Sequence, residues 1–279
     1  MSSTTAYLPS FGGLLHSEWI KLRSLRSTFW CYLAILVLSV GLSALLATAF
    51  PDQGELPYAV RQGIWVQVAT LGIGFSQLVA AVLGALMITG EYGTGMIRST
   101  FTASPHRLPA ITAKALVVGA ATFVVGLVSI VAGALVAVPL LPAVDIHPDL
   151  SDARAWLSFL GGAGYLALVA LLSFSIGAII RNSAGGIAAA LGLILVLPSV
   201  LLIFAEVTHT LWAQNLGRFL PNDAGARMYS YPSEVDTVQQ APTPSEIITL
   251  EPWQGLLVLL AWNIVLYAIA AVLTKRRDA

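Results

Sequence analysis

Long apolar runs alternate with shorter polar stretches along the whole of this sequence. Each run is close to the length of about 20 apolar residues that a helix needs to cross the hydrocarbon core of a bilayer. The runs are continuously apolar, whereas the strands of a membrane barrel alternate apolar and polar residues. The pattern therefore predicts an all-α polytopic membrane protein with six transmembrane helices, at about 29–50, 65–89, 115–141, 156–180, 184–205 and 253–273.

This pattern divides the chain into an N-terminal segment of residues 1–28, a membrane domain of residues 29–273 and a tail of residues 274–279. In the N-terminal segment, apolar residues recur at spacings of three and four beside Trp19, Lys21, Arg23 and Arg26. Such a segment is typical of a helix in the membrane interface, with its cations near anionic lipid. A basic flank that only sets the orientation of the first span is the alternative. The first apolar run is longer than that of a signal peptide, so we expect a retained span.

Two of the connections between spans carry structure of their own. Residues 207–220, between the fifth and sixth spans, are too apolar for a free loop and too short to cross a bilayer. They predict a re-entrant or interfacial helix on the extracytoplasmic side. Residues 221–252 are rich in Pro, Ser and acids and are expected to form an ordered loop or a partly flexible cap.

The connection between the second and third spans, residues 90–114, is a polar and basic island. Its glycines predict a turned start, and Pro109 suits the first turn of the helix that enters the third span. Between them, residues 96–103 are expected to form a short surface helix with Met96, Ile97 and Phe101 beside the cation Arg98. An amphipathic element of this kind can be gripped by a soluble partner.

Charge is strongly segregated although the chain has no net charge. The two termini and the even-numbered connections together carry 10 of the 14 Lys and Arg residues and only 3 of the 14 Asp and Glu residues. Basic residues near the ends of spans stay in the cytoplasm. Both termini and residues 90–114 are therefore predicted to be cytoplasmic, and the unbroken alternation supports the number of spans.

The sequence lacks the motifs of several classes of enzyme and metal site. The sequence holds no GxxxxGK[ST] phosphate loop and no HExxH, and its single cysteine, Cys31, excludes an intrachain disulfide. We therefore expect no enzyme activity, metal or cofactor in this chain, and no nucleic-acid partner. The middle of each predicted span lacks charge, which argues against ion-driven transport. Gln77 and Asn263 lie near mid-span, where they either line a translocation path or join helices by hydrogen bonds.

Two segments, SEWIKLRSLRSTFW and TGEYGTGMIRSTFTASPHRLPAITAKAL, closely resemble the permease subunits of ABC-2-type transporters. The later stretch WAQNLGRFLPNDAGARM is similar to members with re-entrant helices at that place. The resemblance implies a bacterial cell-membrane protein that pairs with a second permease chain, as a homodimer, and with two copies of a separate ATPase. ATP and Mg²⁺ are then expected on that ATPase. The resemblance implies no cargo, but the uncharged spans suggest an amphipathic small molecule, lipid or peptide, and the family implies outward transport.

In that family the segment between spans two and three is a cytoplasmic coupling helix that inserts into the ATPase. The residues that the resemblance assigns to coupling are Glu91, Tyr92, Gly95, Met96, Ile97, Arg98, Phe101 and Arg107. We expect Glu91 to hold the segment by pairing with Arg98 or with a cation of the partner. A non-transporting membrane sensor or assembly component with the same fold is the alternative function.

Overall fold

The computed structural model describes residues 10–49, 56–97, 107–141, 146–232 and 248–276. All regular elements in these ranges are helical. Six helical segments are long and apolar enough to cross a membrane, which confirms the predicted number. They are Arg26–Ala49 (α2), Tyr58–Thr94 (α3, Tyr58–Thr70, and α4, Ile73–Thr94), Arg107–Ala137 (α6), Ala153–Ile180 (α7), Ser183–Thr208 (α8, Ser183–Leu191, and α9, Leu197–Thr208) and Pro252–Arg276 (α13).

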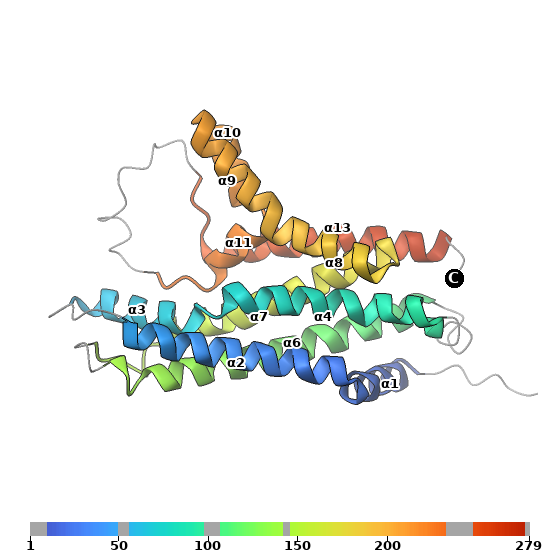
Figure 1. Ribbon diagram of the computed structural model, residues 1–279, viewed down its shortest axis with the longest axis horizontal. Helices are drawn as coiled ribbons and strands as arrows, with labels where there is room; N and C mark the ends of the chain where they lie inside the picture. Colours follow the sequence, from blue (N-terminus) through green and yellow to red (C-terminus); the bar gives the residue numbers. More distant parts are fainter. Residues whose placement is uncertain (1–9, 50–55, 98–106, 142–145, 233–247, 277–279) are drawn as a thin grey trace, which may run out of the picture.

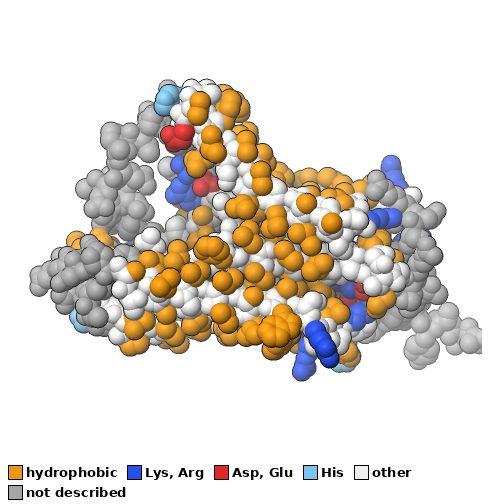
Figure 2. All heavy atoms as spheres, viewed as in Figure 1, with side chains coloured by type: hydrophobic (Ala, Val, Ile, Leu, Met, Phe, Trp, Pro, Cys, Tyr) orange, Lys and Arg blue, Asp and Glu red, His pale blue; other side chains and the backbone are white. Residues whose placement is uncertain are grey.

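The helices α2, α4, α6 and α7 lie side by side and form the centre of the molecule (Figure 1). Helix α7 is the most enclosed, with 78% of its apolar window buried, whereas the windows of the fifth and sixth spans are only 11% buried. Glycine allows α4 and α7 to pack closely: a side chain at Gly84 of α4 would collide with the backbone carbonyl of Ala170 in α7. Hydrophobic side chains cover most of the face seen in Figure 2, as expected for a surface that meets lipid.

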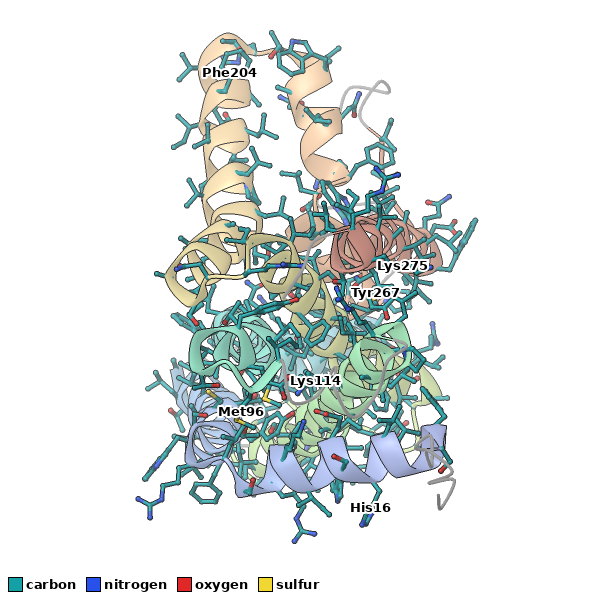
Figure 3. The ribbon with its side chains drawn as sticks, turned by 90° about the vertical axis from the view of Figure 1, so that its right-hand side faces the viewer. His16, Met96, Lys114, Phe204, Tyr267 and Lys275 are labelled. Atoms are coloured by element: carbon teal, nitrogen blue, oxygen red, sulfur yellow. The ribbon has the colours of Figure 1, made fainter. Side chains whose placement is uncertain are left out.

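An even number of spans brings both ends of the chain to one end of the bundle. We call this end, where α1 (Phe11–Ser24), the close of α4, the start of α6 and the close of α13 lie, the terminal end (Figure 1). Helix α1 runs across the terminal end, at a steep angle to the bundle, and packs against α6 (Figure 3). Ser10 caps it by accepting a hydrogen bond from the Gly13 N–H at 3.2 Å.

The second span is longer than the apolar run predicts and is broken. The sequence indicates one helix over residues 65–89, but the structure has α3 and α4 with a break at Leu71 and Gly72. A side chain at Gly72 would collide with the backbone of Ser39 in α2. The break therefore lies where α2 approaches most closely, a contact that the local sequence does not report.

The fifth span also departs from a regular helix, just before Pro198. A wide turn over Gly192–Val196 (η2) separates α8 from α9, and the Leu197 N–H donates to the carbonyl of Gly192. Because proline has no N–H and its ring clashes with the carbonyl four residues earlier, a regular α-helix cannot continue through Pro198. The widened turn accommodates Pro198, and α9 leads away from the bundle (Figure 1).

Two short helices, α10 (Leu211–Arg218) and α11 (Pro221–Met228), connect the fifth and sixth spans. The prediction of a loop or cap for residues 221–252 is wrong for its first part, because α11 is a helix that packs against α7 and α13. Glycines make this docking possible. Side chains at Gly225 and Gly255 would collide with the Tyr165 ring and the Ala224 carbonyl, respectively. A re-entrant position of this connection in the membrane stays a prediction.

Candidate functional site

Four charged side chains meet inside the terminal end and form the most concentrated polar cluster among the described residues. Glu18 and Lys21 come from α1, Glu91 from the last turn of α4 and Lys114 from the second turn of α6. Lys114 Nζ lies 2.6 Å from Glu18 Oε2 and 2.7 Å from Glu91 Oε1. Lys21 Nζ lies 2.7 Å from Glu18 Oε1 and 3.1 Å from Glu91 Oε1. We call these four residues the ionic cluster.

The ionic cluster is electrically balanced and largely withdrawn from solvent. Glu18, Glu91 and Lys114 are 4%, 7% and 3% exposed, while the Lys21 side chain keeps partial access to solvent. Burial lowers the pKa of Lys21, but its bond to Glu18 and the charges of Glu91 and Glu18 outweigh this, so the pKa is raised above the usual 10.5. Each ammonium bridges both carboxylates, and removal of one partner from such a buried pair costs about 3–5 kcal/mol.

The local sequence explains how each helix presents its charge. Glu18 and Lys21 are three residues apart and share one face of α1, the face on which Leu22 is also buried. Lys114 was expected to belong to the connection before the third span, but it is the eighth residue of α6, which begins at Arg107. The apolar run stops at this lysine because of its charge. The helix continues through it because two carboxylates neutralise that charge.

A second group of contacts joins the C-terminal end of α4 to α7 and α13. The Arg181 guanidinium, just after α7, lies 5.1 Å from the centre of the Tyr92 ring. It also donates from Nη2 to the carbonyl of Leu273 in α13, at 3.4 Å. Arg107 Nη1, at the start of α6, donates to the carbonyl of Thr274 at 3.3 Å. The helix ends at the terminal end are therefore joined by cations as well as by apolar packing.

The structure describes some of the residues assigned to coupling, and most of these lie at the end of α4 or directly after it. Glu91 and Tyr92 point into the bundle, where Glu91 pairs with two lysines of this chain. Gly95 ends α4 in the left-handed conformation, with φ of 74°, which only glycine adopts at low cost. Met96 is 49% exposed and Ile97 is buried. Arg98, Phe101 and most of the predicted helix at residues 96–103 lie outside the described residues, so the proposed Glu91–Arg98 pair stays a prediction.

Sequence reasoning selected half of the ionic cluster. It named Glu91 for coupling and Lys21 for the interfacial helix. It took Lys114 only as a basic residue that ties the connection to the third span, and it gave no role to Glu18. The sequence carried one signal that could have found the whole cluster: acidic and basic residues stand beside the ends of the first three apolar runs, and charges of opposite sign can pair. Of the other residues of the N-terminal cluster, Trp19, Arg23 and Arg26 are exposed.

The two polar residues near mid-span are both bonded in this conformation. Gln77 Nε2 donates to the carbonyl of Gly74 at 3.0 Å, and its Oε1 accepts from the hydroxyl of Tyr165 in α7. That hydroxyl also lies 3.4 Å from Asn222 Oδ1 of α11. Asn263 Nδ2 donates to the carbonyl of Leu259, one turn earlier in α13. Gln77 thus joins α4 to α7, and a role of either residue in a translocation path stays a prediction.

Metal chemistry finds no candidate in the part of the chain that the structure describes, since no three His, Cys, Asp or Glu side chains are grouped to hold an ion there. The ionic cluster is suited to joining helices mechanically. A family model described as "ABC-2 family transporter protein" matches residues 14–199 of the chain. No curated protein matches the chain.

Proposed function

The chain belongs to the ABC-2 transporter family, and from this we propose that it is the permease subunit of an ATP-driven exporter. The family consists of membrane components of ABC transporters, which implies association with an ABC ATPase. In the proposed complex, two copies of this chain pair with two ATPase subunits in the bacterial cell membrane. The terminal end faces the cytoplasm, and ATP and Mg²⁺ bind the ATPase.

The ionic cluster is the observation that carries this proposal. The cluster holds both helix ends that flank residues 95–106, namely the close of α4 and the start of α6, and it fixes them to α1. Separating these helices would leave charges unpaired in a buried place, which is strongly unfavourable. A push from an ATPase on residues 95–106 would therefore move α1, α4 and α6 together, instead of bending one helix.

Contacts deeper in the bundle would extend that motion to further spans. Helix α4 is packed tightly against α7 at Gly84 and again at Gly177, where a side chain would collide with Ile88. Arg181 joins the ends of α4 and α13 through Tyr92 and Leu273. The third, fourth and sixth spans thus follow the second, which is what a permease needs to change access between the two membrane faces.

An amphipathic small molecule, lipid or peptide is the cargo that best fits the spans. The six apolar runs of the sequence, 29–50, 65–89, 115–141, 156–180, 184–205 and 253–273, contain no Asp, Glu, Lys or Arg. A charge at the centre of a transmembrane helix costs about 2.5–3.5 kcal/mol on insertion scales. Transporters of ions tolerate this cost because the charge takes part in transport. The low charge content here supports an apolar or amphipathic cargo.

The test measures ATP turnover of the complex of this chain with its ATPase, reconstituted in lipid vesicles. We expect the ATPase to remain bound to the Glu91→Gln variant but to hydrolyse ATP at least about fivefold more slowly. A factor of about five corresponds to the lower end of typical coupling free energies between two sites. The matched control is Glu206→Gln, which removes an exposed carboxylate at the opposite end of the bundle. The double variant Glu91→Gln/Lys114→Met keeps the cluster neutral and should recover thermal stability without recovering turnover.

Two results would contradict the proposal. Equal turnover of the Glu91→Gln and Glu206→Gln complexes would show that the ionic cluster does not transmit force. Failure of any ABC ATPase to co-purify with the chain would favour a non-transporting sensor or assembly component.

A further inference from the structure

An apolar groove runs along the outside of the bundle between α1, α2 and α6. Its larger part is a cavity of about 440 Å³ at the terminal end, within the range of about 300–1,000 Å³ that is usual for small-molecule sites. A second cavity of about 290 Å³ shares part of its wall and continues the groove along α2 and α6. The main side chains of the wall are Trp19, Leu22, Phe29, Tyr32 and Val124.

The length of the groove matches one leaflet of a bilayer. From Arg26, the first residue of α2, to Leu36 at its deep end, the helix rises by about 15 Å. The hydrocarbon core of a bilayer is about 30 Å thick. The groove therefore begins where α1 crosses the terminal end and stops near the middle of the membrane.

The mouth of the groove differs chemically from its floor. Arg23 of α1 lines the mouth, and Arg26 lies close by in the chain. Both are exposed, and no ion pair between described residues includes either of them. Glu18, the acid nearest in the sequence, is already neutralised by Lys21 and Lys114. Two cations are thus available for an anion that comes from outside the chain.

The surroundings of the groove determine what kind of molecule can enter it. It opens sideways between residues that face lipid: Phe29, Val124 and Val128 are 62%, 57% and 57% exposed. Trp19, at the mouth, is 42% exposed and combines an apolar ring with an N–H, a residue type that favours the headgroup region. An occupant therefore needs an apolar chain about one leaflet long and an anionic group at the interface.

We propose that this groove is a binding site for one anionic phospholipid of the leaflet at the terminal end. The phosphate and the anionic headgroup lie against Arg23, with Arg26 near, and an acyl chain follows α2 and α6 as far as Leu36. The site is separate from the ionic cluster, although α1 contributes to both. It is also independent of the proposed transport function, because the binding needs no ATPase.

The test counts the lipids that the full-length chain retains, using native mass spectrometry. Detergent-purified protein is titrated with phosphatidylglycerol and, in parallel, with phosphatidylcholine of the same acyl chains. One Lys or Arg near an anionic surface contributes a factor of about five in binding, so we expect a preference of about fivefold or more for phosphatidylglycerol. Arg23→Gln should reduce that preference several-fold. Ala120 of α6 also lines the larger cavity, so Ala120→Trp should block the groove and lower the binding of both lipids.

Matched variants separate this site from general contact with lipid. Arg276→Gln removes another exposed cation at the terminal end, and Leu135→Trp places the same large side chain at an exposed position elsewhere on α6. Neither should change the bound phosphatidylglycerol. Equal binding of the two lipids by the unmodified chain, an unchanged preference in Arg23→Gln, or unchanged binding of both lipids by Ala120→Trp would overturn the proposal. Loss of coupled ATP turnover alone would not affect it.

Discussion

Buried charge is stable in this protein only where its partners are supplied by other helices. Lys114 is 3% exposed and lies inside an apolar helix, yet two carboxylates from α1 and α4 lie within 2.7 Å of its ammonium. A single lysine in such a place would shift its pKa or destabilise the fold. The residues that pair across helices in the ionic cluster are 23 to 96 positions apart in the sequence. Their pairing is therefore a property of the packed bundle.

Tyr231 provides a residue-scale prediction at the opposite end of the bundle. Its hydroxyl donates to Asp152 Oδ2 at 2.5 Å, and burial together with this bond raises the pKa of Tyr231 to about 12. The neutral phenol is therefore favoured by folding. Its contribution to stability is complete below pH about 10, the usual pKa of tyrosine, and is lost as the pH rises to about 12.

We expect Tyr231→Phe to lower the melting temperature at neutral pH by about 2–4 °C, since a hydrogen bond contributes about 1 kcal/mol. The same variant should lose less stability than the unmodified chain between pH 10 and 12. Melting temperatures measured by fluorescence across this pH range check both points. An unchanged alkaline decline in the variant would show that Tyr231 is not responsible for it.

At the scale of elements, glycine decides which helices can approach one another. The docking of α11 on α7 and α13 depends on Gly225 and Gly255, because any side chain there would collide with the Tyr165 ring or the Ala224 carbonyl. Periodicity reports that a segment is helical, but it does not report a neighbour. The sequence analysis assigned the eight residues of α11, PNDAGARM, to a loop because their composition is polar. The packing partners of α11 are not visible in the sequence.

Substitution of these glycines tests the docking of α11. We expect Gly225→Ala and Gly255→Ala each to destabilise the protein by about 1–3 kcal/mol, the usual cost of overpacking. Gly217→Ala in α10 is the matched control, because its added methyl group would meet open space. Melting temperature and the rate of tryptic cleavage after Arg227 are the measurements. Equal behaviour of Gly225→Ala and Gly217→Ala would show that α11 is not held as the structure indicates.

At the scale of the whole molecule, an enclosed centre is surrounded by spans that expose apolar surface. Helix α7 is 78% buried over its apolar window, while the fifth and sixth spans, at 11%, face outward. Apolar exposure of this kind is stable in lipid, because lipid tails are as apolar as the side chains. The exposed spans are available to lipid and to the proposed second permease chain.

The orientation of the molecule in the membrane is a prediction at this scale. In a Cys31→Ser background, single cysteines are placed at the terminal end, as Gly12→Cys and Arg276→Cys, and at the opposite end, as Leu150→Cys and Glu251→Cys. All four positions are exposed. We expect a membrane-impermeant maleimide to label the second pair in intact cells and the first pair only after permeabilisation. The reverse labelling would invert the proposed topology.

The sequence by itself determined the fold class, the number of spans and the family resemblance. Helix formation in a bilayer depends on a continuous apolar run, and this property is local, so it can be read residue by residue. The match over residues 14–199 confirms the resemblance. The ends of the spans were less accurate, because helices such as α6 continue through polar residues that neighbouring helices satisfy.

Only the tertiary structure decided what these helices form together. It paired Glu18 and Lys21 with Glu91 and Lys114, placed Tyr92 beneath Arg181 and opened a groove between α1, α2 and α6. Each of these features joins residues from separate parts of the chain. Their energies come from distances and burial that exist only after packing, and no pattern within a single segment encodes them.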